Sequence, residues 1–188
     1  MIEFKFNEIK TTQAASLFLK NNSGKMSYMK LIKLLYLVDR QALKLWERPL
    51  TGDVYFSMKH GPVLSNVLDI INNGGDPEDN SYWYEYITAP SEYEVELKKD
   101  SSELDALSKR ELELITEIDE AYKDISQWDM VEICHNVLPE WENVGSTSKL
   151  IKVEKILEKL DKTNEEINAI EEEVSNLNYI KEILSIDD

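Results

Sequence analysis

Cys134 and His135 are the residues of this chain whose types could carry nucleophilic catalysis. A thiolate beside a histidine base forms a catalytic pair, but neighbours on one helix point about 100° apart and do not share a proton. The second histidine is His60, and one cysteine with two distant histidines lacks the ligand spacing of a metal site. The sequence contains neither a GxxxxGK[ST] nor a GxGxxG motif, so we expect no glycine-rich phosphate-binding loop. We therefore predict no catalytic residue, no metal, no cofactor and no enzyme activity.

The elements that would position any functional site are concentrated between Met29 and Val67. The part from Met29 to Trp46 has apolar residues at helical spacing over a wide face, which consists of Leu31, Ile32, Leu35, Tyr36, Val38, Ala42, Leu45 and Trp46. Such a wide stripe predicts a helix buried on more than one side. Pro49 should end this helix, and Gly61-Pro62 should start a new helix at Val63.

Further helices and one β-hairpin are expected around this central helix. The hairpin is predicted from Tyr82–Thr88 and Tyr93–Leu97, because the second segment alternates apolar residues with glutamates and Pro90 lies between the two. Its crowded aromatic residues fit either packing against helices or a partner interface. Capping boxes and apolar spacing predict the helices 13–21, 63–73, one from Ser108, 128–137, 150–160 and 164–184. The predicted fold class is mainly α (α+β): a compact domain over 1–145 and a C-terminal helical hairpin over 146–188.

Composition and charge narrow the classes of function. A single cysteine fits a reducing cytoplasm, and the first ten residues do not resemble a signal peptide. No apolar segment is long enough to span a membrane. The net charge is −16, and residues 71–188 carry 31 acidic against 11 basic side chains. This surface disfavours nucleic acid as a partner. It would attract a basic protein, or it only keeps the chain soluble.

Three short segments resemble the signature of the SocA-like antitoxin family, whose domain is called Panacea and which occurs in bacterial and phage toxin–antitoxin pairs. They are Lys30-Leu31-Ile32-Lys33-Leu34-Leu35-Tyr36, Arg48-Pro49-Leu50 and Lys59-His60-Gly61-Pro62-Val63. The segment from Ile125 to Trp141 is similar to the closing part of the family, in which a helix with a histidine precedes a proline and a tryptophan. Met58 stands where the family has an aromatic residue. The resemblance covers roughly residues 11–142 and implies a protein that binds and silences a toxin.

We therefore predict an antitoxin that neutralises a cognate toxin protein by direct contact. The residues expected to contact the partner lie in the turn region or next to it: Asp53, Tyr55, Phe56, His60, Gly61, Pro62, Lys33 and Tyr36. For each of these residues a purely structural role is the alternative. One competing function is an adaptor that delivers a bound protein to a cytoplasmic protease through the C-terminal helices. Another is an acidic mimic of nucleic acid that inhibits a host enzyme. A homodimer is compatible with all three.

Overall fold

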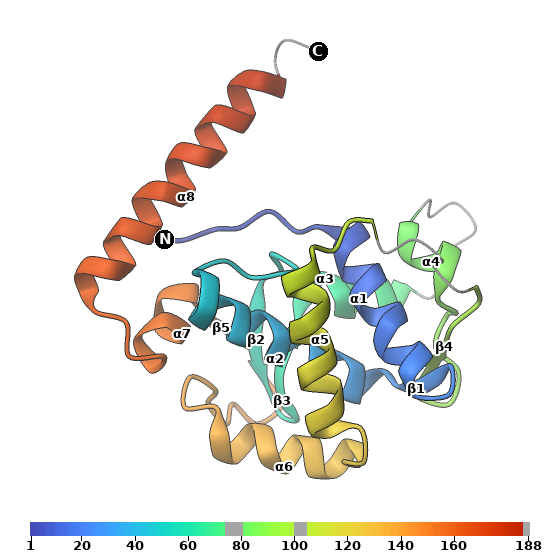
Figure 1. Ribbon diagram of the computed structural model, residues 1–188. Coiled ribbons are helices and arrows are strands. Elements are labelled where there is room, and N and C mark those ends of the chain that lie inside the picture. The colour runs from blue at the N-terminus through green and yellow to red at the C-terminus, as the bar shows by residue number, and fades with distance from the viewer. Residues whose placement is uncertain (74–80, 100–104, 186–188) are drawn as a thin grey trace.

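A single helix, α2 (Tyr28–Trp46), forms the centre of the molecule. The structure is a computed structural model that describes residues 1–73, 81–99 and 105–185. Helices and strands from both before and after it in the chain contact α2 (Figure 1). Every residue from Lys30 to Asp39 is buried, as expected for a helix that is enclosed on several sides. The predicted central helix is confirmed, although Leu45 at its end is exposed rather than buried.

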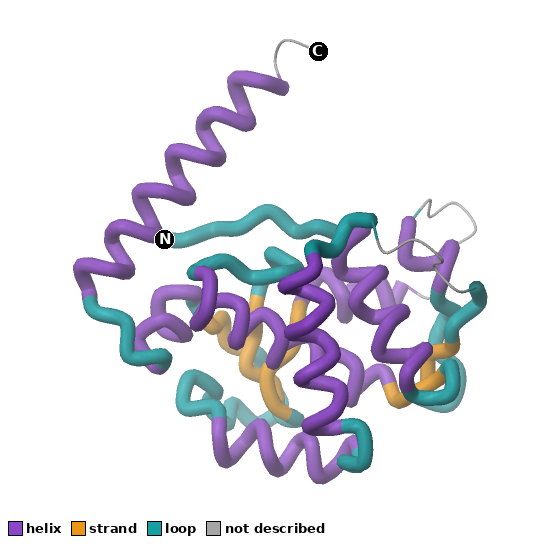
Figure 2. The backbone as a smooth tube through the Cα atoms, in the orientation of Figure 1, coloured by secondary structure: helices purple, strands orange, loops and turns teal. Residues whose placement is uncertain are grey.

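The other helices surround α2 as the fold class predicts, mainly α with a small β part (Figure 2). In chain order they are α1 (Glu8–Asn21), α3 (Ser65–Asn73), α4 (Tyr82–Tyr86), α5 (Lys109–Tyr122), α6 (Gln127–Val137), α7 (Val153–Lys159) and α8 (Asn164–Ser185). Ser108 and Ser126 accept backbone N–H groups at the starts of α5 and α6, and Thr163 does so at the start of α8. These caps confirm the helix starts that the sequence predicts. Among the described residues, no helix has the length and apolar character to cross a membrane.

The strands form two small antiparallel sheets. One pairs β1 (Lys25–Ser27) with β4 (Glu94–Glu96). The other has the order β3-β2-β5, with β2 at Tyr55–Met58, β3 at Gly61–Leu64 and β5 at Lys149–Ile151. Strands β2 and β3 form a hairpin around the two-residue turn Lys59-His60, with Met58 opposite Gly61. The fold therefore contains a β-hairpin, but the hairpin lies in the Panacea-like signature and not at the predicted place.

The predicted hairpin of Tyr82–Thr88 and Tyr93–Leu97 is wrong because its first arm is the short helix α4. Glu8 stabilises the start of this helix by accepting the backbone N–H of Trp83 at 3.0 Å. The helical turn places the whole Trp83 side chain in the core, which an alternating strand pattern did not anticipate. The second arm is a strand, but β4 pairs with β1, and the two predicted arms meet at the isolated bridge Ile87–Leu97.

The start of α3 also differs from the prediction, since Pro62 lies in β3 and the helix begins at Ser65. Asp53 determines this start because its carboxylate accepts the backbone N–H groups of Asn66 and Val67, a favourable arrangement at a helix N-terminus. Proline is tolerated in β3 because this strand lies at the edge of its sheet.

The C-terminal region contributes to the same core. The predicted helix 150–160 is shorter, because Lys149–Ile151 is the strand β5, which pairs with β2, and α7 starts only at Val153. Helix α8 buries Ile167, Ile170 and Val174 near its start. Its second half extends away from the body (Figure 1) and exposes Tyr179, Ile180, Ile183 and Leu184.

Candidate functional site

A groove opens beside the β2–β3 turn, and we call it the hairpin groove. It has a volume of about 590 Å³ and lies between the hairpin, the start of α2 and the start of α6. Its apolar lining comes from these three elements, from α3 and from the loop before β4: Tyr28, Met29, Ile32, Met58, Val63, Leu68, Tyr93 and Trp128. Tyr93 is 75% exposed and Trp128 is 57% exposed. Large aromatic side chains that protrude at the rim of an apolar groove are typical of protein-binding surfaces.

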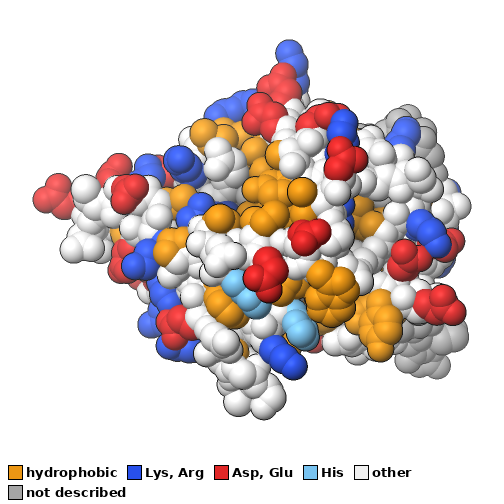
Figure 3. All heavy atoms as spheres, turned by 90° about the horizontal axis from the view of Figure 1, so that it is seen from below, with side chains coloured by type: hydrophobic (Ala, Val, Ile, Leu, Met, Phe, Trp, Pro, Cys, Tyr) orange, Lys and Arg blue, Asp and Glu red, His pale blue; other side chains and the backbone are white. Residues whose placement is uncertain are grey.

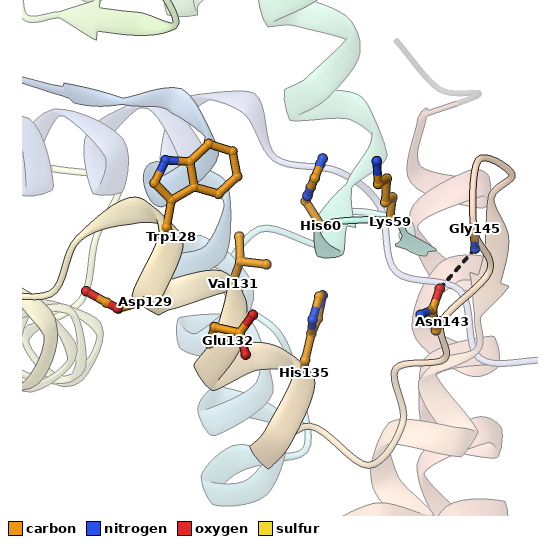
Figure 4. A pocket seen from close by; sticks show the side chains of 9 residues that line it. All are labelled: Lys59, His60, Trp128, Asp129, Val131, Glu132, His135, Asn143 and Gly145. Carbon is orange, nitrogen blue, oxygen red and sulfur yellow. Dashed lines mark hydrogen bonds between the residues drawn. The ribbon is translucent and has the colours of Figure 1, made fainter.

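A second hollow, the histidine pocket, lies on the other side of His60 and Trp128 and has a volume of about 460 Å³. Figure 4 shows His60 on the hairpin turn and His135 on α6, both lining this pocket together with Glu132. His60 and His135 are far apart in the sequence, but the fold brings them into one pocket. Seen from below, the two pale-blue histidines lie beside orange hydrophobic side chains (Figure 3).

Aromatic contacts fix the two histidine rings. His60 meets the Trp128 ring edge-on, with 5.9 Å between the ring centroids. His135 stacks on Trp141, with 4.0 Å between the centroids and 11° between the planes. Burial is the main effect that lowers the pKa of His135, so this imidazole is neutral at neutral pH. These two aromatic contacts hold the rings in place.

Lys33 in α2 contacts both Gly61 and Pro62 of the hairpin. Its ammonium is buried and donates a 2.7 Å hydrogen bond to the carbonyl oxygen of Pro62. Gly61 has φ +98°, and a Cβ added there would lie 3.0 Å from Cε of Lys33 and 3.4 Å from Cβ of Cys134. Glycine is therefore required both by the backbone conformation and by the close approach of Lys33. Burial lowers the pKa of Lys33 to about 8.

Asp39 holds the segment that follows α2. Its carboxylate accepts the backbone N–H groups of Leu50 and Thr51, both at 2.8 Å, and the hydroxyl groups of Thr51 and Tyr55. Burial raises the pKa of this carboxyl, whereas these hydrogen bonds lower it. Burial is the larger effect, and the pKa is about 6. The Arg48–Leu50 signature thus forms a loop that a buried acid in the central helix orients.

The segment after α6 is attached to α2 and to the hairpin by its own contacts. Glu140 is fully buried and accepts the hydroxyl of Tyr36 at 2.9 Å and Nε of Arg40 at 2.7 Å. Trp141 donates from Nε1 to the carbonyl oxygen of Met58 at 3.0 Å. Trp141 therefore fixes β2 and Lys33 fixes β3, so the turn Lys59-His60 is supported at both of its strands.

The structure separates the residues predicted to contact a partner by depth. The buried ones are Asp53, Tyr55, Gly61, Pro62, Lys33 and Tyr36, whereas Phe56 is half-buried and His60 is exposed. Tyr36 and Tyr55 meet edge-to-face beneath the hairpin, with centroids 5.5 Å apart. The sequence missed the groove's aromatic rim, because Tyr28, Tyr93 and Trp128 come from three separate parts of the chain. Aromatic residues are common at interfaces, but the proximity of these three depends on the tertiary fold.

The one cysteine, Cys134, packs in the hydrophobic core. Cys134 is buried, and burial raises the pKa of its thiol to about 11, so the thiolate is scarce at neutral pH. Within the described residues, no group of three or more His, Cys, Asp or Glu side chains could hold a metal ion. What the site offers is an apolar, aromatic-rimmed surface with cationic side chains, a composition suited to binding.

Comparison with known families agrees with this picture. Residues 31–142 match the family model described as antitoxin SocA-like, Panacea domain. No curated protein and no solved structure matches the chain significantly. The matched residues cover more than half of the chain and include Lys33, Asp39, the hairpin and Trp141, so the contacts described above link the parts of the family signature. The chain belongs to the family of SocA-like antitoxins with a Panacea domain.

Proposed function

We propose that this protein is an antitoxin that binds a cognate toxin protein and neutralises it by direct contact. Membership of the antitoxin family, over residues 31–142, is the observation that carries the proposal. The hairpin groove supports it, because exposed aromatic side chains around an apolar hollow are typical of sites where a protein partner is anchored. A binding role also fits a domain whose cysteine and histidines are held in packing contacts. We therefore expect a stoichiometric complex with the partner.

Charge supports a basic toxin. Residues 71–188 have a net charge of −20, from 11 basic and 31 acidic side chains, and the whole chain has −16. Such a field increases the association rate with a positively charged protein and weakens with salt. The groove would then provide the specific contact, while the acidic remainder would bring the partner to it.

Co-expression tests the proposal. Each protein encoded next to this one in its genome is expressed alone and then together with it, and growth is measured. We expect one neighbour to arrest growth alone and to be harmless in the presence of this protein, with which it should co-purify at a fixed ratio. A neighbour that is harmless alone, or that remains toxic beside this protein, contradicts the proposal.

The far end of α8 favours a second candidate, an adaptor that delivers its bound protein to a protease. Tyr179, Ile180, Ile183 and Leu184 are exposed where α8 extends away from the body, and exposed apolar residues on a helix suit docking to another protein. Under this model the partner is degraded in cells containing the complex. Under the blocking model its amount stays constant and only its activity disappears, so the half-life of the partner distinguishes the two.

A further inference from the structure

The charges of the hairpin groove differ from those of the rest of the chain. Its charged lining residues are Lys33 and Lys59, and none of the described residues that line it is acidic. His60 lines both this groove and the histidine pocket. The chain as a whole has 37 acidic and 21 basic side chains. A cationic apolar groove in an acidic protein indicates that the ligand combines an apolar part with a negative charge.

Lys33 gives the second, independent indication of a ligand. The side chain is 1% exposed and lies at the floor of the groove. An ammonium has three N–H donors, yet within the described part of the chain its one hydrogen-bond acceptor is the carbonyl oxygen of Pro62. A buried ammonium with donors left over is costly unless an acceptor completes its coordination. The groove is the open side from which such an acceptor can come.

The dimensions of the groove favour a chain end over a segment that passes through. A volume of about 590 Å³ is in the range of pockets that enclose one small ligand, which suits a short piece of chain. The last residue of a chain carries an apolar side chain and a carboxylate on the same Cα, so both groups can enter one groove together. An internal Asp or Glu would need a second, neighbouring residue to supply the apolar part.

We propose that the hairpin groove binds the C-terminus of a partner protein, with the last apolar side chain against Met29, Met58 and Trp128 and the terminal carboxylate at Lys33. This inference rests on the proposed function in one respect, since the toxin is the partner that it concerns. Capture of a terminal carboxylate is an established mode of peptide recognition. Here the donor is a buried lysine of the central helix, and the exposed rings of Tyr93 and Trp128 cover the apolar side chain.

A pair of dipeptides tests the groove without the toxin. N-acetyl-leucyl-phenylalanine with a free carboxylate and its C-terminal amide are titrated into methyl-labelled protein, and the resonances of Met29 and Met58 are followed. The acid should shift both methyl groups and bind at least about tenfold more tightly than the amide, the size of one charge-assisted hydrogen bond. Lys33→Met should remove this preference.

A second variant keeps the test valid if Lys33→Met does not fold. Tyr93→Ala changes a rim residue that is 75% exposed, so it should fold normally and weaken both peptides by a similar factor. Tyr179→Ala, which is 64% exposed on α8, is the matched control and should change neither. Equal binding of acid and amide, or no shift of Met29 and Met58, overturns the inference. Co-expression with the toxin is a separate measurement, so failure of the groove proposal leaves the antitoxin proposal to be decided on its own result.

Discussion

The ammonium of Lys33 donates to the carbonyl oxygen of Pro62 across 2.7 Å, and this bond joins the central helix to the hairpin. Gly61 lies against the lysine side chain, so that a Cβ added to it would meet Cε of Lys33 at 3.0 Å, a tight contact. The pair explains two segments of the family signature as one contact, since the lysine needs the glycine beside it and the carbonyl oxygen of the next residue. The hairpin groove and the histidine pocket both border the turn that this contact supports.

Gly61→Ala should destabilise the protein and disturb the turn. The residue has φ +98°, where an alanine is strained, and its Cβ would approach Cε of Lys33 at 3.0 Å. We expect a loss of about 2–3 kcal/mol in the free energy of unfolding, from strain and the displaced lysine together. Denaturant unfolding measures it.

Gly24→Ala provides the control for backbone strain alone. Gly24 has φ +86°, and nothing lies within 4 Å of an added Cβ, so this variant should lose only about 1 kcal/mol. The difference between the two variants is the cost of the contact with Lys33. Equal losses would mean that Lys33 moves aside freely, contrary to the role given to it here.

Much of the helical scaffold could be predicted from the sequence, because local signals determine it. The apolar stripe of α2 and the capping box at Ser108 each act within one helix. The hairpin could not be located in the same way. The aromatic run at Tyr82 favours a strand by composition, but the carboxylate of Glu8, from a distant part of the chain, stabilises a helical turn there.

The candidate binding site shows the same division between local and tertiary signals. The signature segments identified the hairpin region, but six of the eight residues expected to meet a partner are buried and hold the region in shape. Their spacing in the sequence marks them as part of the family signature. Their burial in the structure shows that they support the hairpin from inside the fold. The rim residues Tyr93 and Trp128 lie far from each other and from the signature in sequence, and no local pattern connects them.

Substitution of the groove rim should impair neutralisation with little change in stability. Trp128→Ala removes a large, 57% exposed side chain whose ring meets His60 edge-on. If it anchors the toxin, affinity should fall by about 30-fold, corresponding to about 2 kcal/mol for an interface hot spot. Calorimetry with the purified toxin and growth in the co-expression assay both measure this.

The control for this substitution is Tyr179→Ala, an exposed aromatic residue on α8. It should leave affinity and growth rescue unchanged. The opposite result, with Trp128→Ala fully active and Tyr179→Ala inactive, would place the toxin contact on α8 instead of the hairpin groove.

Truncation after Asn176 separates the blocking and adaptor models. Removal of residues from 146 onward would delete β5, which pairs with β2, and the buried Ile156 and Leu157, so the resulting defect could come from misfolding. Truncation after Asn176 retains Ile167, Ile170 and Val174, which are the buried residues of α8. Direct blocking predicts full neutralisation by the truncated protein. Loss of toxin turnover with unchanged toxin binding would instead support the adaptor.

The stability of the protein should depend on the protonation of Asp39. Burial raises the pKa of this carboxyl from 3.8 to about 6, so the folded state binds more protons than the unfolded state between these values. The contribution of Asp39 to the free energy of unfolding must therefore fall as pH rises from about 4 to about 6, by about 3 kcal/mol in total. Below that window both states are protonated, and above it both are ionised, so the contribution is constant outside it.

Asp39→Asn isolates this contribution from the other carboxylates. An amide nitrogen cannot accept from the hydroxyls of Thr51 and Tyr55 as the carboxylate does, so the variant should be less stable at every pH. The decisive quantity is the difference between the two proteins, measured by urea unfolding at about pH 4 and about pH 7. The unsubstituted protein should gain more than the variant on acidification, because the amide that replaces the carboxyl does not titrate in this range. Parallel pH dependences would show that the buried carboxyl is ionised equally easily in both states, and that its hydrogen bonds to the Leu50–Thr51 loop offset the cost of burial completely.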